Sequence, residues 1–495
     1  MSKIKNRFRA FYAGMLLLGA VQYTTAQAVG TPYIISTQDI PFSFLSGGTG
    51  IESPAVVEQT ADGGYITMAG TNSSATGDVT MTSRGQTDMW VVKYDQYGKI
   101  EWQRLYGGAN FEYSGDLKQT TDGGYIMVVQ TGSSGTGDVM TAPANHGGNS
   151  DVWVVKLTST GAITWQKILG GTGSEQVKAV LQTDDGGYLI GASTNSSATG
   201  EVTSTRSNAG DFDFWVVKLT STGTLTWQQT YENPGPKDAS VGSDYLYDIV
   251  PASDGTGYIL TGYGSSYYQT TNVSNSQDYF IVKINLTGTM QWRKLYGSPD
   301  SEISFSATPT SDGGCVIVGY SAGSAAGDVT GTNHGGNDMW ILRLNPSGDI
   351  VWQKLYGGSG DERAYSVVTA ADGGYMVAGN STSSASGDVT AINHGGNDVC
   401  VFKLTSAGVI QRQALYGGTS ADGNVSSTVV NLRPVTIRQA ADGGYIVVST
   451  SGSNNSGDVT DTNNGSGGIT NFDQWIFKMD TIGNIVWVPH TGQKN

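Results

Sequence analysis

The stretch "INHGGNDVCVFKLTSAGVIQRQALYGG", residues 392–418, has the same pattern as "TNHGGNDMWILRLNPSGDIVWQKLYGG", residues 332–358. The two stretches begin sixty residues apart, and each follows a "DGG" tripeptide. Repetition at a near-constant period within one chain indicates a repeat architecture in which each copy forms one structural unit. The shared residues therefore either build the fold or form a set of binding sites.

Seven copies of this unit occur in the 495-residue chain. The "DGGY" motif or a close variant begins at Asp62, Asp122, Asp185, Asp254, Asp312, Asp372 and Asp442. Each is followed by the pattern D-x-[W/F/C]-x-x-[K/R] and then by G-x-[I/L/M]-x-[W/R]. Each copy is typical of four short strands, which in the sixth copy are residues 364–370, 374–380, 398–404 and part of 408–418.

The second strand of each copy is apolar at nearly every position, which indicates that both faces of the sheet are covered. The fold class predicted is all-β, a seven-bladed β-propeller with four antiparallel strands per blade. The expected parts are a signal peptide (1–28), an N-terminal segment with one extra strand (29–48) and the propeller (49–495). The predicted blades are approximately 49–108, 109–171, 172–233, 234–298, 299–358, 359–418 and 419–495.

Two segments compete to complete the last blade. "IPFSFLSGG" (40–48) resembles a fourth strand, and "NIVWVPHTG" (484–492) follows the third strand of blade seven. The turn "TIGN" makes pairing of the second segment local. We therefore expect 484–492 to close the ring and 40–48 to form a fifth, outer strand or a covering segment.

Residues 1–28 are typical of a secretory signal. A basic start (Lys3, Lys5, Arg7, Arg9) precedes a short apolar run (10–21) and small residues at 24–28. Cleavage would remove four of 27 basic residues and none of 42 acidic residues, which takes the net charge from −15 to −19. The sequence thus predicts a secreted, periplasmic or cell-surface monomer that spans no membrane after cleavage and binds no nucleic acid.

Two cysteines occupy repeat positions that other copies fill with aromatic residues. Cys315 replaces the tyrosine of "DGGY", and Cys400 replaces the tryptophan of the third strand. We predict that both are small buried hydrophobic residues and that they form no disulfide.

The motifs "DGGY", "HGGxDxWVVKL" and "GxIxWQKxYGG" resemble secreted β-propeller repeat proteins of the Bacteroidota, over about residues 40–489. The resemblance implies an extracellular or surface propeller without an assigned reaction. Many such proteins carry a C-terminal type IX sorting domain, which is not evident before Asn495. "KLTSTGAITWQKILGG" (156–171) also looks like the repeats of pyrroloquinoline-quinone dehydrogenases, but their vicinal cysteines and calcium-and-base constellation are not evident.

Two repeated sets of carboxylates should lie on one face of the ring, where the loops between strands two and three meet those between blades. The first set is in "GDV": Asp78, Asp138, Asp328, Asp388 and Asp458, with Glu201 in the third blade. The second set is Glu52, Glu112, Glu175, Glu302, Glu362 and Asp422. Calcium takes six to eight oxygen ligands, so calcium binding is one interpretation. Turn capping is the favoured one, because a residue needed in every blade is usually needed by the blade.

Other polar residues also receive structural interpretations. The recurrent Lys or Arg of the third strand should pair with a repeated carboxylate, because lysine is rarely buried alone. Three of the four histidines occupy one repeat slot, "NHGG", in different blades: His146, His334 and His394. We expect no metal shared between them, and no catalytic residue can be nominated.

Blade four departs most from the repeat. Its leading loop (231–248) is long, and its segment 263–277 lacks both "GDV" and "NHGG". These segments hold six tyrosines, which are the candidate ligand site: Tyr231, Tyr245, Tyr247, Tyr263, Tyr267 and Tyr268. The alternative is that they pack the longer loop onto its neighbour. Tyrosine suits sugars and extended peptides because it offers a flat apolar ring and a hydroxyl group.

The favoured function is an exported binding propeller that recognises a glycan or another envelope or extracellular ligand on its loop-rich face. One alternative is a structural or adhesive protein–protein scaffold of the cell envelope. Another is a glycoside hydrolase or lyase that uses rim carboxylates. The sequence leaves enzymatic activity open and favours binding, with calcium as the one cofactor considered.

Overall fold

The computed structural model describes residues 39–139, 146–205, 210–233, 242–268, 273–423, 434–465 and 472–489, which belong to one compact unit, Asp39–Asn495. Residues 1–28, and with them the predicted signal peptide, lie outside the described residues. Within these ranges every regular element is a β-strand, and no helix has the length and apolarity to cross a membrane.

Seven four-stranded antiparallel sheets form a ring, which confirms the predicted seven-bladed β-propeller. The first strands are β3 (Glu52–Gln59), β7 (Glu112–Gln119), β11 (Glu175–Gln182), β15 (Asp244–Pro251), β19 (Glu302–Pro309), β23 (Glu362–Thr369) and β27 (Val435–Gln439). The second strands are β4 (Tyr65–Thr71), β8 (Tyr125–Thr131), β12 (Tyr188–Thr194), β16 (Gly257–Tyr268), β20 (Cys315–Ser321), β24 (Tyr375–Ser381) and β28 (Tyr445–Ser451).

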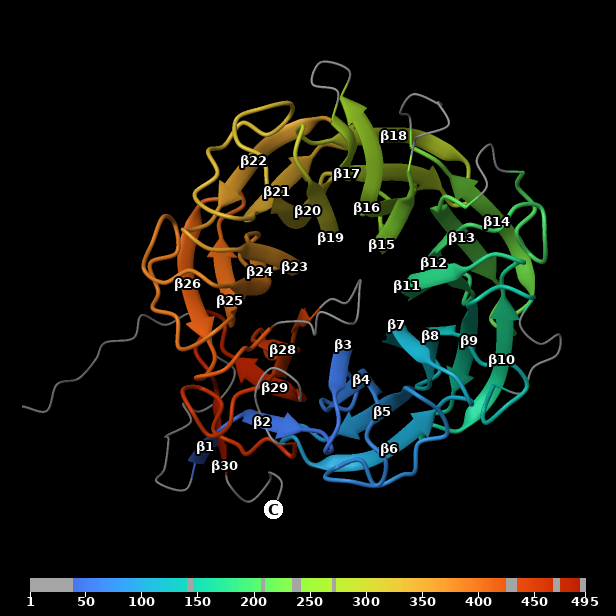
Figure 1. Ribbon diagram of the computed structural model, residues 1–495, viewed down its shortest axis with the longest axis horizontal. Helices are drawn as coiled ribbons and strands as arrows, with labels where there is room; N and C mark the ends of the chain where they lie inside the picture. Colours follow the sequence, from blue (N-terminus) through green and yellow to red (C-terminus); the bar gives the residue numbers. More distant parts are fainter. Residues whose placement is uncertain are drawn as a thin grey trace, which may run out of the picture. The chain divides into compact units, whose positions relative to one another are not determined.

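The third strands are β5 (Asp88–Tyr94), β9 (Asp151–Leu157), β13 (Asp213–Leu219), β17 (Val273–Asn285), β21 (Asp338–Leu344), β25 (Asp398–Leu404) and β29 (Asp473–Met479). The fourth strands are β6 (Ile100–Tyr106), β10 (Ile163–Leu169), β14 (Leu225–Tyr231), β18 (Met290–Tyr296), β22 (Ile350–Tyr356), β26 (Ile410–Tyr416) and β2 (Ser43–Ser46). Figure 1 shows first strands nearest the centre of the ring and fourth strands at its perimeter.

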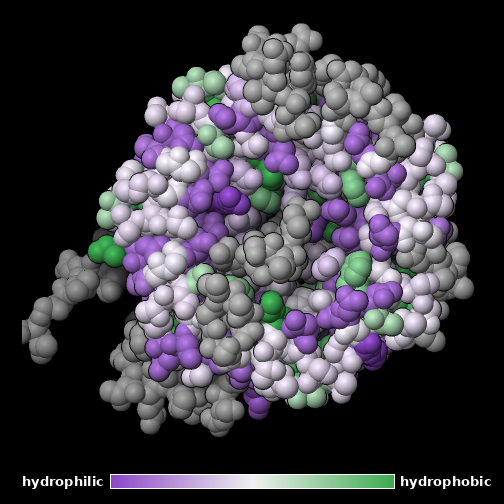
Figure 2. All heavy atoms as spheres, viewed as in Figure 1, coloured by the Kyte–Doolittle hydropathy of each residue, from purple (hydrophilic) through white to green (hydrophobic). Residues whose placement is uncertain are grey.

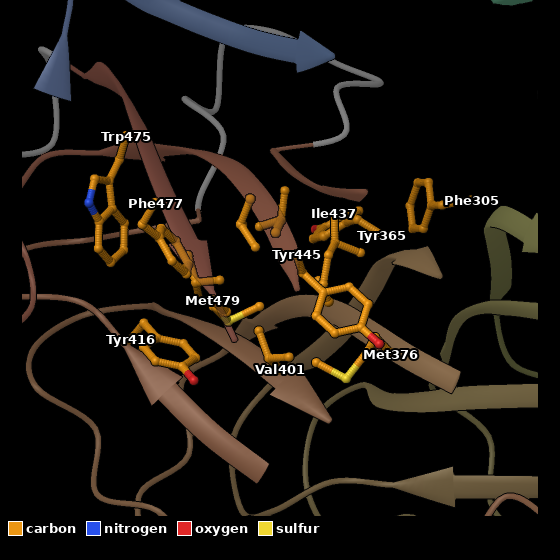
Figure 3. Close-up of a cluster of buried hydrophobic side chains, with 14 of the residues drawn as sticks. Phe305, Tyr365, Met376, Val401, Tyr416, Ile437, Tyr445, Trp475, Phe477 and Met479 are labelled. Atoms are coloured by element: carbon orange, nitrogen blue, oxygen red, sulfur yellow. The ribbon is translucent and has the colours of Figure 1, made fainter. Parts of the chain in front are cut away.

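The apolar second strands are buried between neighbouring blades, as their composition predicts. Every residue of β4, β12, β20, β24 and β28 is buried, whereas the outer strand β6 is largely half-buried or exposed. One hydrophobic cluster combines Trp475 and Phe477 of β29 with Tyr416 of β26 and Phe305 of β19 (Figure 3). Cys315 and Cys400 are buried and form no disulfide, as predicted.

The prediction for ring closure is wrong. Strand β2, from the N-terminal segment, pairs with β29 as the fourth strand of blade seven, with Leu45 opposite Trp475. The C-terminal strand β30 (Trp487–Pro489) instead pairs with β1 (Asp39–Pro41) in a separate two-stranded sheet. The Trp475 indole N–H donates to the Ser43 hydroxyl at 2.9 Å, and this contact replaces the Trp90–Gln103 bond of blade one.

Blade four also differs from the prediction. Strands β16 and β17 have 12 and 13 residues, and they remain paired as far as Tyr268 and Val273. Much of segment 263–277, which was predicted to be a loop, therefore extends the β-hairpin. The segment contains tyrosine, threonine and valine, which are common in strands.

Strand β2 should make a large contribution to stability because its side chains pack against blade one. The Phe44 ring is 4% exposed, and its centroid lies 5.5 Å from that of Tyr94 in β5. We expect Phe44→Ala to lower the free energy of unfolding by about 3–5 kcal/mol, since truncation of a buried phenylalanine leaves a cavity. Urea unfolding measures this change, and Val351→Ala, at a site 57% exposed, is the control. Equal small effects of both substitutions would contradict closure through β2.

Candidate functional site

The repeated Lys or Arg of each third strand pairs with the aspartate of "DGG" in the same blade, as predicted. All seven N–O distances lie within 3.3 Å, for Lys93–Asp62, Lys156–Asp122, Lys218–Asp185, Lys283–Asp254, Arg343–Asp312, Lys403–Asp372 and Lys478–Asp442. A hydrogen bond from Thr183, with others from Lys218 and Gly187, holds the pKa of Asp185 at about 2. These ion pairs belong to the blade and not to a ligand site.

The second carboxylate set is buried and bound to the chain's own donors. Glu52 is fully buried, and it accepts the Gly48 N–H at 3.0 Å and the Thr71 hydroxyl at 2.6 Å. The corresponding contacts recur at Glu112, Glu175, Glu302, Glu362 and Asp422. These carboxyls therefore fix the link from one blade to the next, which is the structural role favoured by the sequence.

Each of these carboxyls also faces an aspartate that begins the third strand of the preceding blade. Asp473 is fully buried, accepts the Asn464 N–H at 2.8 Å and hydrogen-bonds the Glu52 carboxyl. A Cβ atom on Gly47 would lie 2.4 Å from an oxygen of either carboxyl, so only glycine fits there. The same juxtaposition occurs in Glu112–Asp88, Glu175–Asp151, Glu302–Asp278, Glu362–Asp338 and Asp422–Asp398, and we call these six the junction pairs.

Two carboxylates this close in a buried site cannot both be ionised, so one of them keeps a proton. Burial raises the pKa of Glu175 to about 7 and that of Asp473 to about 7. Burial also raises the pKa of Asp422 to about 6. The Glu52–Asp473 and Glu175–Asp151 pairs therefore each act as a hydrogen-bonded carboxylic acid and carboxylate across a blade boundary.

The "GDV" carboxylates lie at the same boundaries. Asp78, Asp138, Asp328, Asp388 and Asp458 each accept the N–H of the first glycine of the preceding "GG" or its variant, at 3.1–3.4 Å. The "NHGG" slot and its equivalents approach them from the preceding blade, as in His146–Glu201 (3.3 Å) and Asn464–Asp78 (3.2 Å). Within the described ranges, no three His, Cys, Asp or Glu side chains are grouped to hold a metal ion. Calcium binding stays a prediction from the sequence.

The six predicted tyrosines do not form one group. The Tyr231 hydroxyl donates to the Gly288 carbonyl at 2.6 Å, and Tyr106, Tyr296, Tyr356 and Tyr416 make the same contact elsewhere, so Tyr231 is a repeat residue on an outer strand. Tyr267 and Tyr268 end β16, and their side chains lie outside the described part of the structure. Tyr245, Tyr247 and Tyr263 do lie together. The centroid of the Tyr263 ring lies 5.2 Å from that of Tyr245 and 6.0 Å from that of Tyr247.

These three tyrosines belong to a larger arrangement that we call the aromatic row. Its members are Phe212, Tyr245, Tyr247, Tyr263, Phe305, Tyr320 and Tyr365. Ring centroids of Tyr247 and Phe305 lie 4.9 Å apart, and those of Phe305 and Tyr365 lie 4.8 Å apart. The Arg363 guanidinium lies 4.7 Å from the centre of the Tyr320 ring, within range of a cation–π interaction.

A β-bulge in the first strand of each of these blades places the row. Tyr247, Phe305 and Tyr365 are the unpaired bulge residues of β15, β19 and β23, and a bulge re-aims the side chain that it carries. Their rings are 2–6% exposed, whereas Tyr245 and Arg363 are half-buried. The row thus has a buried aromatic floor and a partly exposed edge. Phe305, Arg363 and Tyr365 were not predicted from the sequence, although alignment of the first strands places each beside its blade-four equivalent. Tyr320, in the second strand β20, was also not predicted.

Searches of protein-family models and of curated proteins find no match to this chain. Among solved structures, the chain is similar to a protein of unknown function from Bacteroides caccae, at 11% identity over 76% of this chain and 94% of that one, with a TM-score of 0.34. It is also similar to the NanB sialidase of Streptococcus pneumoniae, at 11% identity over 90% of this chain and 71% of the sialidase, with a TM-score of 0.41. A third similar structure is a putative 6-phosphogluconolactonase from Bacteroides fragilis, at 11% identity over 88% of this chain and 96% of that one, with a TM-score of 0.41. At these values the similarities carry no inference about activity.

The junction pairs predict that the protein is more stable at mildly acidic pH than at alkaline pH. Folding raises the pKa values of Glu175 and Asp473 to about 7, so the folded state binds protons at these residues more tightly and loses stability as pH rises from about 4 to about 7. The Asp185–Lys218 pair has the opposite sign, and its contribution is lost only as pH falls below about 4. We therefore expect a higher urea midpoint at pH 5 than at pH 8.

Substitution of one junction carboxyl tests the cause of this dependence. In Asp473→Asn, an amide N–H replaces the shared proton, while the amide oxygen can still accept the Asn464 N–H. We expect a higher urea midpoint than the parent at pH 8 and a smaller difference between pH 8 and pH 5. Asp184→Asn, at an exposed aspartate, is the charge-matched control. Proton sharing at this junction would be refuted if Asp473→Asn had a lower urea midpoint than the parent and the same difference in midpoint between pH 5 and pH 8.

Proposed function

We propose that this chain is a binding propeller whose ligand contacts the exposed edge of the aromatic row. The supporting observation is that, among the six first strands with a described bulge, the bulge residue is aromatic in blades four to six and not in blades one to three. The corresponding bulge residues of blades one to three are Ala55, Gly115 and Lys178. The same backbone therefore forms without aromatic residues, and the row is not explained by the fold.

The chemistry of this edge suits a glycan or an extended polypeptide segment. Tyr245 stacks on Phe212 with ring centroids 5.0 Å apart, and the residue is half-buried. Ile303 and Arg363 occupy the same strand position in the next two blades and are also half-buried. A flat aromatic surface beside a guanidinium can stack on an apolar face and donate to hydroxyl or carbonyl oxygens.

This function belongs outside the cytoplasm if residues 1–28 direct export, and the resemblance to secreted propellers of the Bacteroidota supports that setting. An adhesive scaffold would use the same edge with a protein partner. The hydrolase alternative is not proposed, because the repeated carboxyls that it would need are engaged in junction pairs or accept backbone N–H groups.

Substitution at the edge of the row tests the proposal. We expect Tyr245→Ala to weaken binding of ligands found on glycan and peptide arrays by about tenfold, which corresponds to ~1.4 kcal/mol of lost contact. Tyr113→Ala is the matched control, because Tyr113 holds the equivalent position in blade two and also stacks on a phenylalanine, Phe111, at 4.8 Å. Equal affinities for both variants would place the ligand elsewhere.

A further inference from the structure

A tryptophan fills the groove between outer strands at five blade boundaries. These residues are Trp102, Trp165, Trp227, Trp292 and Trp352. Each indole covers a hairpin glycine of the next blade, and a Cβ atom added to that glycine would lie 2.7–3.0 Å from the nearest indole carbon. The Trp352 indole also donates its N–H to the Ser406 carbonyl at 3.2 Å. The indole thus fixes the size and shape of the space at these boundaries.

The boundary between blades six and seven lacks this indole. Arg412 takes the place of the tryptophan and donates to the Asn484 side chain. A Cβ atom added to the hairpin glycine Gly483 would meet only the Tyr416 hydroxyl, at 3.5 Å. Ala414 also replaces the lysine or arginine that most other outer strands carry at this position. Two large side chains of the repeat are therefore absent from one boundary.

A groove of about 400 Å³ occupies the vacated space. Ala414 and Ile485 provide apolar walls, and Arg412, Asp458, Thr460 and Asn484 provide donors and acceptors. A second groove, of about 350 Å³, lies between blades three and four, where Gln229 replaces the same lysine, but there Trp227 still covers Gly288. The groove between blades six and seven, which we call the Arg412 groove, differs from the second groove because no indole covers its hairpin glycine, Gly483.

We propose that the Arg412 groove binds one hexopyranose unit of a glycan. A pyranose ring is close in size to the missing indole, and it presents an apolar face together with hydroxyl groups around its edge. Those hydroxyls can satisfy a guanidinium, a carboxylate, a hydroxyl and an amide at once, whereas an aromatic ring would leave most of them unpaired. The site lies on outer strands, apart from the aromatic row, and does not depend on the proposed function of that row.

Saturation-transfer NMR on the full chain tests this proposal with three probes: methyl α-D-glucopyranoside, methyl α-D-galactopyranoside and methyl α-D-mannopyranoside. We expect signals from at least one probe, and their loss in Arg412→Trp, which restores the residue found at five other boundaries. Ala414→Lys introduces the residue found at the equivalent position of β22, Lys354, and should also abolish the signals. This second variant is used if Arg412→Trp does not fold. Arg104→Ala, at an exposed arginine on β6, should leave the signals unchanged.

The proposal is overturned by the absence of signal from all three probes, or by signals that persist in both groove-filling variants. It is also overturned if N-acetyl-tryptophanamide binds the groove and the sugars do not. If Tyr245→Ala loses binding on the arrays but keeps the sugar signals in NMR, the result concerns the aromatic row alone. The two tests therefore distinguish failure of the proposal for the aromatic row from failure of the proposal for the Arg412 groove.

Discussion

The apolar character of both faces of every blade is the constraint from which the architecture follows. A sheet with two apolar faces must be covered on each side, and in a ring of identical sheets each neighbour supplies that cover. Five of the second strands, β4, β12, β20, β24 and β28, are accordingly buried along their whole length. The most regular motifs act at the blade boundaries: junction pairs lie on the loop-rich side, and indoles cover hairpin glycines on the outer side. Their regularity reflects assembly of the ring.

Much of this fold could be predicted because its determinants repeat along the chain. The period, the four strands per copy and the Asp–Lys pairs all depend on residues that recur seven times. Closure could not be inferred from the turn at 480–484 alone, because that turn forms while the following residues pair with β1. The better signal was Gly47–Gly48, since a "GG" pair or a close variant follows almost every fourth strand and here follows β2.

The candidate site was predicted only in part, and the reason is physical. Sequence proximity correctly grouped Tyr245, Tyr247 and Tyr263, but it also included Tyr231, whose hydroxyl makes a contact repeated in other blades. Phe305 and Tyr365 were missed because a bulge position has no motif of its own. Its residue is free to vary, so aromatic residues at successive bulges are recognised only when the first strands of the blades are aligned with one another. Positions where geometry is constant and chemistry changes are the ones that can carry function in a repeat protein.

Closure through β2 also has a consequence for the order in which the molecule can be completed. Ser43 bonds Trp475 across 432 positions of the chain, so β2, which is synthesised before all seven blades' other strands, can pair only after β29 has been made. Contacts between residues so distant in sequence are slow to form, because the intervening chain must first be ordered. Until β2 and β29 pair, the apolar face of blade one that packs against blade seven in the finished ring has no cover. Completion of the ring is therefore expected to be a late step in folding.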